Sequence, residues 1–425
     1  MNSEMKKICC AKLLLPFVLI IFSVNISAQE LYPVAVDSFP NADFQKDTLS
    51  FSLDTSNLVP FFHKFSKIVN DNSGNINILH LGASHVQAGT MSHRIRRNLL
   101  SQFPDLIARR GMIFPYSAAP KCNNPNDYLV KKNTTFGLVR NVYKNVEKPL
   151  GVTGIAVYTS DTLAELTIFL KDSDLTFVTD RIILLGFPDS TWVTPTIVID
   201  KIEYFPVSVD TADRRYIYDV PFVKDSFDIR FNCPPNGSFT LTGIFLDSDA
   251  PGISFHSIGV NGANSNDYLK CDYFEKDLQL INPDLVIFGI GINDAAGSSF
   301  DTVAFERNYL LLINKIKSVN PDCAFIFITN NDSYKRVSRR KYAVNQNGPI
   351  IRRAFYRLAE QTGGAVWDQF DIMGGLRSME KWRAAKLAQY DRVHFTYSGY
   401  NILGDLFFNA FLDAWEKVKN LPPSN

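Results

Sequence analysis

The feature that most constrains the fold is a regular alternation in the last third of the chain. Short apolar runs, LVIFGI at 285–290 and AFIFIT at 324–329, alternate with stretches of helical period at 301–319 and 349–361. Runs that are apolar at every position indicate strands buried on both faces, and strands joined through helices run parallel. This part of the chain therefore predicts an α/β fold, in which a parallel sheet lies between two layers of helices.

The same alternation begins earlier, with the β-rich run INILHL at 76–81. Between about 126 and 250 the pattern changes, because short β-branched segments such as SFTLTGIFL at 238–246 are separated by Asp, Pro, Gly and Ser, without a long helical stretch. This spacing is typical of an all-β sandwich. We therefore expect a discontinuous α/β domain formed by 29–125 and 251–425, interrupted by an inserted β-sandwich domain at 126–250.

The N-terminal residues 1–28 have the composition of a secretory signal peptide. Three lysines precede an apolar run at 13–24, and the small residue Ala28 closes the segment. The apolar run is shorter than the roughly 20 residues that a membrane-spanning helix requires. We expect a secreted or periplasmic protein without stable membrane insertion after the signal is removed; an uncleaved anchor is the alternative.

Charge and cysteine content exclude several classes of function. The 425 residues contain 44 Lys and Arg against 43 Asp and Glu, so the basic footprint of a nucleic-acid-binding protein is absent and no nucleic-acid partner is expected. Neither C-x-x-C nor H-E-x-x-H occurs, and we predict no metal and no cofactor. Beyond the predicted signal, Cys122, Cys233, Cys271 and Cys323 could form a disulfide or remain free thiols.

Four unusual polar turns stand next to predicted strands or helices. They are GASH at 82–85, GVNGA at 259–263, GIND at 291–294 and DRVH at 391–394. The first three follow strands, and the fourth precedes the last helix. Because ligands of open parallel sheets bind at the carboxyl ends of the strands, we expect these turns to meet at one edge of the sheet.

The residue types in these turns are those of nucleophilic ester chemistry. Ser84 stands at a strand-to-helix turn, His394 is a candidate base, and Asp391 could hold the other ring nitrogen of that histidine. The backbone N–H groups of Ser84 and Gly262 and the side-chain amide of Asn293 could bind a tetrahedral oxyanion. Taken singly, each residue also has a purely structural interpretation, such as a helix N-cap for Ser84.

The four turns resemble the four sequence blocks of the SGNH (GDSL-type) hydrolase family, which carry Ser, Gly, Asn and a closing D-x-x-H. The resemblance covers about 60–125 and 251–418 and implies a flavodoxin-like three-layer fold. The segments LGASHVQAG, GVNGA, GIND and DRVHFTYSGY are similar, more narrowly, to secreted bacterial members. Some of those members carry a β-domain between the first and second blocks and remove O-acetyl groups from peptidoglycan or other polysaccharides.

One position departs from the family pattern. The first block is usually Gly-Asp-Ser, and Ala83 stands where the Asp would be. That Asp is not the catalytic base, so its absence need not abolish turnover. The replacement by Ala83 removes a polar group near the site, so a weak or altered enzyme is an alternative to a fully active one.

Two further features are candidate substrate contacts. His85 follows the proposed nucleophile, although a polar residue in the first turn of a helix is the plainer interpretation. A basic stretch at 335–341 includes Arg339 and Arg340, and it could be either a solvated face or a rim that recognises an anionic glycan. We therefore predict His85, Arg339 and Arg340 as substrate-binding residues.

The sequence leads to one hypothesis and two rivals. The first is a secreted serine esterase that removes O-acetyl groups from an acetylated carbohydrate, a cell-wall or other polysaccharide, through an acetyl-Ser84 intermediate. The second is an O-acetyltransferase that uses the same residues and passes the acetyl group to a sugar. The third is a catalytically impaired carbohydrate-binding protein on a hydrolase scaffold, with the β-domain as the binding module.

Overall fold

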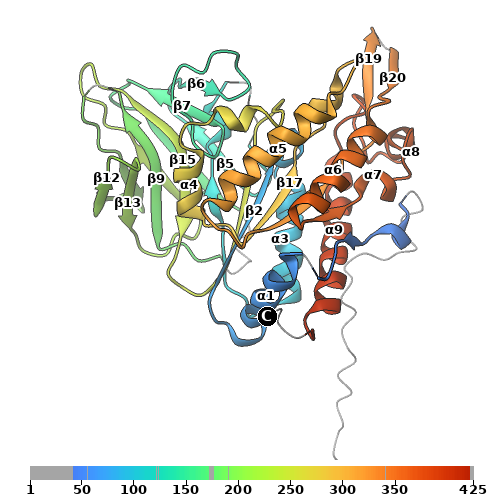
Figure 1. Ribbon diagram of the computed structural model, residues 1–425. Coiled ribbons are helices and arrows are strands. Elements are labelled where there is room, and N and C mark those ends of the chain that lie inside the picture. Colours follow the sequence, from blue (N-terminus) through green and yellow to red (C-terminus); the bar gives the residue numbers. More distant parts are fainter. Residues whose placement is uncertain are drawn as a thin grey trace, which may run out of the picture. The chain divides into compact units, whose positions relative to one another are not determined.

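The computed structural model describes residues 42–421, except 55, 121, 123, 172–176, 190 and 340 (Figure 1). These residues belong to one compact unit. The predicted signal peptide at 1–28 lies outside the described residues. Within the described part, none of the helices has the length and apolar character needed to cross a membrane.

The parallel sheet predicted from the alternation is present and organises the chain (Figure 1). Its strands lie in the order β1-β21-β18-β17-β2-β16-β3, and all pair in parallel except β1, which is antiparallel to β21. In that order the strands are Leu49–Ser50, Ala365–Trp367, Ala324–Ile328, Leu285–Gly289, Asn75–Gly82, Gly252–Gly259 and Ala108–Arg109. Strands β17 and β18 are apolar along their whole length because both faces are covered, whereas β2 and β16 also carry buried His and Ser side chains.

Two groups of helices cover the two faces of this sheet. On one face, helix α9 (Tyr397–Val418) contacts both α1 (Leu58–Asp71) and α3 (Thr90–Gln102). Helices α4 (Phe274–Ile281), α5 (Thr302–Lys317) and α6 (Gly348–Thr362) form the second group. Different aromatic side chains of the sheet pack against the helices on each face.

On the α9 face, Trp367 of β21 meets Phe407 with ring centres 5.4 Å apart. On the α6 face, Phe327 of β18 meets Phe355 at 6.3 Å. The arrangement is the three-layer α/β sandwich expected from the sequence.

The middle of the chain forms two antiparallel sheets (Figure 1). The first has the order β11-β10-β14-β8-β5, with strands Ile202–Tyr204, Thr196–Ile199, Ser226–Arg230, Glu165–Leu170 and Tyr128–Lys132. The second has the order β12-β13-β9-β15-β7-β6, with strands Ser208–Asp210, Arg215–Asp219, Arg181–Pro188, Phe239–Asp247, Ile155–Thr159 and Gly137–Arg140. The inserted all-β architecture is thus confirmed, while the domain boundaries at 126 and 250 stay a prediction.

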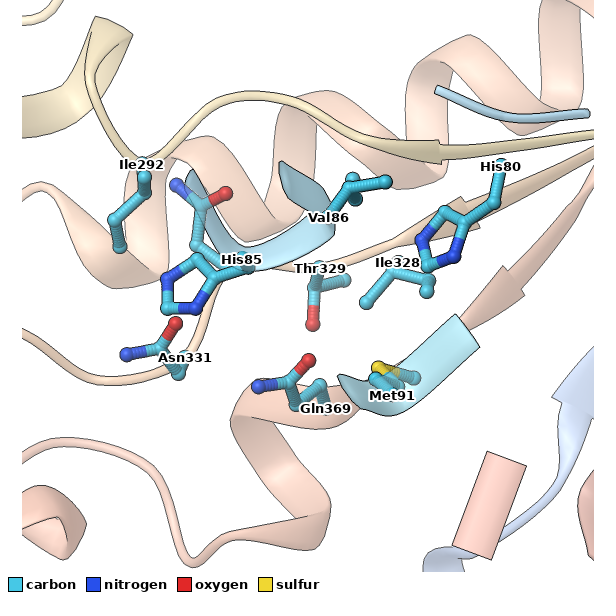
Figure 2. Close-up of a pocket in the computed structure, with 11 residues that line it drawn as sticks. His80, His85, Val86, Met91, Ile292, Ile328, Thr329, Asn331 and Gln369 are labelled. Carbon is cyan, nitrogen blue, oxygen red and sulfur yellow. The ribbon is translucent and has the colours of Figure 1, made fainter. Parts of the chain in front are cut away.

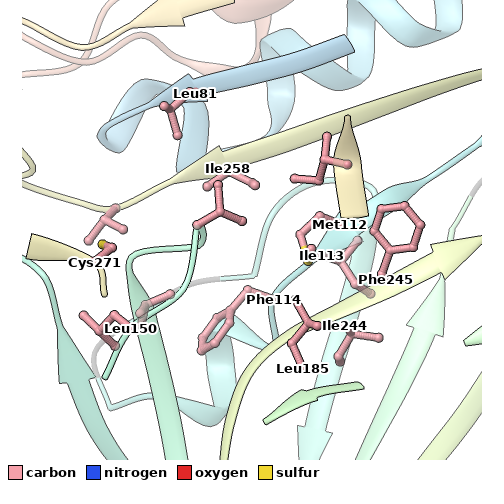
Figure 3. Packing of buried hydrophobic residues seen from close by; sticks show 14 of the residues in the cluster. Leu81, Met112, Ile113, Phe114, Leu150, Leu185, Ile244, Phe245, Ile258 and Cys271 are labelled. Carbon is pink, nitrogen blue, oxygen red and sulfur yellow. The ribbon is translucent and has the colours of Figure 1, made fainter. Parts of the chain in front are cut away.

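The antiparallel region and the parallel sheet share one apolar core. Strand β4 (Gly111–Ile113) precedes the predicted insert but pairs with β15. Figure 3 shows Met112 of β4 and Ile244 of β15 beside Leu81 and Ile258 of the parallel sheet, all in one buried cluster. The two parts are therefore packed together and do not form separate cores.

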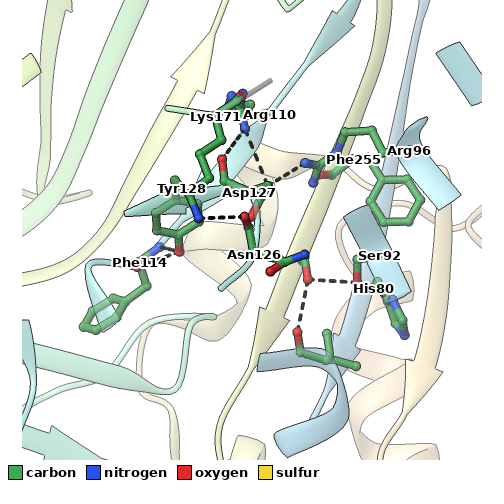
Figure 4. Close-up of polar contacts among 12 residues, drawn as sticks. His80, Ser92, Arg96, Arg110, Phe114, Asn126, Asp127, Tyr128, Lys171 and Phe255 are labelled. Carbon is green, nitrogen blue, oxygen red and sulfur yellow. Dashed lines mark hydrogen bonds and ion pairs between the residues drawn. The ribbon is translucent and has the colours of Figure 1, made fainter. Parts of the chain in front are cut away.

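A buried ionic cluster also joins the two parts. Figure 4 shows Asp127, just before β5, between the guanidinium groups of Arg96 and Arg110. The Arg96 Nη1 to Asp127 Oδ2 distance is 2.7 Å. The Arg110 guanidinium also lies over the Phe177 ring at 4.3 Å. All three charged side chains are buried, so each depends on the others for compensation.

Several local expectations need correction. The residue pattern predicts one helix at 268–280 and one strand at 202–209. The structure has the 3-10 helix η4 (Asp267–Lys270) before α4, and it divides the strand into β11 and β12 around Pro206. The helix expected directly after the Ser84 turn is one turn, α2 (Ser84–Gln87), because Gly89 takes a left-handed φ of 71° before α3 begins. All four cysteines named above are free thiols.

The remaining elements were not expected. Helices α7 (Gln369–Ile372) and α8 (Ser378–Ala384) lie between β21 and α9. Short 3-10 turns occur elsewhere in the chain, at Phe44–Lys46, Tyr116–Ala118 and Asp294–Ala296. The basic stretch at 335–341 forms a two-stranded antiparallel hairpin, β19 (Tyr334–Ser338) and β20 (Lys341–Val344).

Candidate active site

Ser84 begins the one-turn helix α2 at the carboxyl end of β2. The turn is fixed from behind, since the Tyr268 hydroxyl donates to the Gly82 carbonyl at 2.7 Å. The Gln87 N–H donates to the Ala83 carbonyl at 2.9 Å. A helix this short has only a small dipole, so the groups that stabilise charge near Ser84 must come from other loops.

The structure brings Ser84, His394 and Asp391 into one hydrogen-bonded line. The Ser84 Oγ to His394 Nε2 distance is 2.8 Å, and the His394 Nδ1 to Asp391 Oδ2 distance is 2.7 Å. With the Nδ1 proton donated to the carboxylate, Nε2 is free to accept the serine hydroxyl proton. This is the geometry that a serine nucleophile and its base require.

Asp391 is held as an anion by its own turn. Its Oδ1 accepts the backbone N–H groups of Val393 at 2.9 Å and His394 at 3.0 Å. Burial alone would raise the pKa of Asp391, but hydrogen bonds from the His394 ring and these N–H groups lower that pKa to about 2. The carboxylate can therefore orient the imidazole and stabilise its protonated form.

The loop that carries both residues is tightly bound to its neighbours. Arg392 takes a left-handed φ of 58°, and the Gln389 N–H donates to the His394 carbonyl at 2.8 Å. Thr396 then caps α9, because its Oγ1 accepts the Gly399 N–H at 3.3 Å. The long helix α9 thus starts three residues after His394 and fixes where the loop ends.

Gly262 and Asn293 lie in the same pocket as Ser84 and His394. Gly262 has a φ of 86°, a left-handed conformation that L side chains rarely adopt. The Asn293 side-chain amide donates one hydrogen to the Ala263 carbonyl at 3.0 Å, which leaves its second hydrogen for the pocket. Within the described residues, the backbone N–H groups of Ser84 and Gly262 have no hydrogen-bond acceptor.

The pocket has a volume of about 530 Å³ and a polar lining. Its lining residues are Ser84, Gln87, Ala88, Asn124, Asn261, Gly262, Asn293, Gln389, His394 and Tyr400. Five of these carry side-chain amides, and none of the lining residues is Lys, Arg, Asp or Glu. Amides offer both donors and acceptors, which suits a hydroxyl-rich ligand.

Four of these amides were not predicted as site residues from the sequence, and Asn261 among them lies inside the GVNGA turn. Gln87 lies three residues after Ser84 on α2, and Gln389 lies two residues before Asp391, so closeness to the motifs could have indicated both. Asn124 has no such signal, because it lies in the segment before β5 and reaches the pocket through the tertiary fold. Its Oδ1 accepts the Val130 N–H at 3.1 Å.

His85 does not line this pocket. It borders a second, smaller cavity of about 30 Å³, where Figure 2 shows it facing Asn331 and Ile292. Its Nδ1 is 2.8 Å from the Tyr400 hydroxyl, and burial lowers the pKa of His85 to about 3, so the ring is neutral. Its ring centre lies 5.2 Å from that of His394.

The remaining predicted residues lie elsewhere. Arg339 is exposed at the tip of the β19–β20 hairpin and is not among the residues that line the pocket, while Arg340 falls outside the described residues. Ala83, at the position of the family's Asp, is fully buried. In the described part of the chain, no three His, Cys, Asp or Glu side chains gather as metal ligands would.

The fold is a three-layer α/β sandwich, and its sheet edge carries Ser84, His394 and Asp391 in one hydrogen-bonded line. Residues 245–402 match the GDSL-like Lipase/Acylhydrolase family. The matched segment contains Gly262, Asn293 and the Asp391–His394 turn but begins after Ser84. This segment carries a GDSL-like lipase/acylhydrolase domain, and the match together with the fold supports carboxylic ester hydrolase activity.

Solved structures extend the likeness in fold over nearly the whole chain. A peptidoglycan O-acetylesterase is similar with a TM-score of 0.70 and 19% identity, covering 87% of this chain and 99% of its own. A coverage that high includes most of the antiparallel region.

Smaller structures match only in part. An acetyl xylan esterase has a TM-score of 0.30 and 20% identity over 37% of this chain and 81% of its own. A lipase/acylhydrolase from Enterococcus faecalis has a TM-score of 0.30 and 21% identity over 41% and 80%. No curated protein sequence matches the chain.

Proposed function

We propose that this chain is a secreted serine esterase that removes O-acetyl groups from a cell-wall or other polysaccharide. The observation that carries the proposal is the hydrogen-bonded line from Ser84 through His394 to Asp391, which opens on an amide-lined pocket. The fold shared with a peptidoglycan O-acetylesterase supports the substrate class, and the composition of residues 1–28 supports secretion.

In the first half of the reaction, Ser84 Oγ attacks the carbonyl carbon of the acetyl ester while His394 Nε2 takes the hydroxyl proton. The tetrahedral oxyanion accepts hydrogen bonds from the backbone N–H groups of Ser84 and Gly262 and from the Asn293 amide. The bond to the sugar oxygen then breaks, and His394 returns the proton to that oxygen. An acetyl-Ser84 ester and a free sugar hydroxyl result.

In the second half, water attacks the acetyl-Ser84 carbonyl and gives its proton to His394. The bond to Ser84 breaks, acetate leaves, and the serine recovers its proton. Asp391 stays ionised throughout and keeps Nε2 of the histidine directed at Ser84. The amides of the pocket would hold the sugar that carries the ester.

The test compares wild type with Ser84→Ala on 4-nitrophenyl acetate and on a chemically O-acetylated polysaccharide, with release of acetate as the readout. We expect a loss of about 10⁴-fold or more in kcat on both substrates and an unchanged melting temperature. Ser398→Ala, which removes an exposed hydroxyl from the first turn of α9, is the matched control. Equal acetate release by the Ser84→Ala protein would refute the proposal, and acetyl transfer to an added oligosaccharide without acetate release would identify a transferase.

A further inference from the structure

The β19–β20 hairpin concentrates positive charge on a chain that is otherwise balanced. It carries Lys335, Arg336, Arg339 and Lys341, here called the basic arm, and no Asp or Glu occurs between Asp332 and Glu360. The whole chain has a formal charge of only +1. The hairpin is therefore far more positively charged than the chain as a whole.

The outer part of the hairpin takes no part in the core. Arg336, Arg339 and Lys341 are exposed, and Val337 is 64% exposed. Within the described part of the chain, none of the four basic side chains forms an ion pair with a carboxylate. Two strands alone are marginally stable in water, so a projecting hairpin of this kind must be held at its root.

The base of the hairpin, here called its root, contacts the loop that carries His394 on one side. The Tyr334 N–H donates to the Arg392 carbonyl at 3.2 Å. The Arg392 guanidinium lies 4.3 Å from the centre of the Tyr342 ring and 5.8 Å from that of Tyr334. Such stacking of Arg on aromatic rings adds stabilisation beyond the backbone contact.

The other side of the root is mounted on the loop that carries Asn293. The Asn345 amide donates to the Ala295 carbonyl at 3.0 Å, and the Lys335 ammonium donates to the Gly297 carbonyl. The hairpin thus rests on both loops that bring the proposed base and the proposed oxyanion donor to the pocket. Figure 1 shows β19 and β20 extending outward from this end of the molecule.

The length of the basic arm places its positive charges at a distance from the Ser84 pocket. Five residues lead from Tyr334 to Arg339, which at about 3.3 Å per residue places the tip roughly 15 Å beyond the root. The pocket itself is lined by uncharged amides. A ligand of the arm must therefore be long enough to contact the hairpin while another part of it occupies the pocket.

We propose that the basic arm binds the anionic part of a carboxylate-bearing polysaccharide and so holds that polymer across the Ser84 pocket. This inference rests on the proposed function and adds the charge of its substrate. A polyanion matches the unpaired charges of the arm. A lipid surface fits less well, because Val337 is the one large apolar side chain that is exposed on the described hairpin, and membrane-binding elements combine basic with several large apolar residues.

The experiment reverses the charge of the arm with Arg336→Glu, Arg339→Glu and Lys341→Glu together. The matched control reverses three exposed lysines far along the chain, Lys67, Lys201 and Lys224, and changes the net charge by the same amount. Three substrates are compared at low salt: O-acetylated polygalacturonate as the anionic polymer, O-acetylated dextran as the neutral polymer, and 4-nitrophenyl acetate. Binding of polygalacturonate is measured separately by affinity electrophoresis in the Ser84→Ala background.

We expect the arm variant to raise KM for the anionic polymer by about tenfold or more and to weaken its retention by polygalacturonate, with both effects shrinking as salt is added. Its kcat/KM for the neutral polymer and the aryl ester should stay within about twofold of wild type, as should all values of the lysine control. Unchanged KM and retention, or an equal loss with the control or with dextran, would overturn the proposal, as would binding of the arm to phosphatidylglycerol vesicles but not to polygalacturonate. If wild type hydrolyses no ester, the proposed function fails, while the retention assay still decides whether the arm binds the polyanion.

Discussion

The junction of the antiparallel region and the edge of the parallel sheet use charged residues in opposite ways. At the junction, Asp277 pairs with Arg214 at 2.9 Å, and their side chains are 1% and 3% exposed. At the sheet edge, Asp391 pairs with His394 at 2.7 Å, with side chains 45% and 33% exposed. An aspartate thus belongs to a buried pair at the junction and to a partly exposed pair at the sheet edge.

The difference shows where stability and chemistry are located. A buried pair has lost its water, so removal of one partner leaves an uncompensated charge inside the protein. The pair at the edge keeps access to water and to the pocket, so its members can be changed with little cost to folding. We therefore expect variants at the edge to lose activity without stability, and variants at the junction to do the reverse.

Asp391→Asn should have the largest effect on catalysis. The amide cannot accept the ring proton as the carboxylate does, so we expect kcat to fall by about 10⁴-fold while the melting temperature changes little. Because the pKa of Asp391 is about 2, the carboxylate is charged throughout pH 5 to 8, so Asp391 itself should add no ionisation to the wild-type pH profile of kcat/KM over that range. A second acid-limb ionisation above pH 5 that is present in the wild type and absent from Asp391→Asn would mean that Asp391 becomes protonated in the wild type, contrary to the hydrogen bonds described above.

Asn293→Ala should have the next largest effect. Loss of one oxyanion donor costs about 10² to 10³ in kcat. The measurement is kcat and KM on 4-nitrophenyl acetate, with melting temperature as the check on the Ala263 contact. A rise in KM at constant kcat would show that Asn293 binds the ground state and has no preference for the oxyanion.

Asp277→Asn should have the smallest effect on chemistry and a large one on folding. It leaves Arg214 without its carboxylate, and the Val152 N–H loses a charged acceptor that now lies at 2.9 Å. We expect the free energy of unfolding to fall by about 3 to 5 kcal/mol, and kcat of the folded protein to stay within about twofold. The measurement is urea unfolding followed by circular dichroism.

The double variant Asp277→Leu with Arg214→Met is the matched control for that experiment. It removes both charges, so most of the lost stability should return. A single variant as stable as wild type would show that the junction does not depend on this pair.

The sequence alone predicted the parallel sheet and the set of residues at its edge, because both follow from local patterns. Apolar runs with intervening helices specify a parallel sheet, and polar turns at the ends of such strands meet at one edge. Ser84, Gly262, Asn293 and the Asp391–His394 turn all line or adjoin one pocket. Their catalytic roles stay predictions.

The missed features depend on contacts between distant parts of the chain. Asn124 reaches the pocket because of where β5 pairs, and β4 joins β15 across more than a hundred residues. The basic stretch carries no apolar alternation, so nothing in it indicated a hairpin; the hairpin exists because Arg392 and Asn345 hold its root. Such partners are not encoded in any short segment.

The most direct test of the account is which side chain reacts as the nucleophile. The protein is treated with a fluorophosphonate probe, digested, and mapped by mass spectrometry, in wild type and in His394→Ala. We predict a single labelled peptide that contains Ser84 in wild type, with labelling slowed by at least about 10²-fold in His394→Ala. Label on another residue, or the same labelling rate without His394, would contradict the assignment of Ser84 and His394 as nucleophile and base.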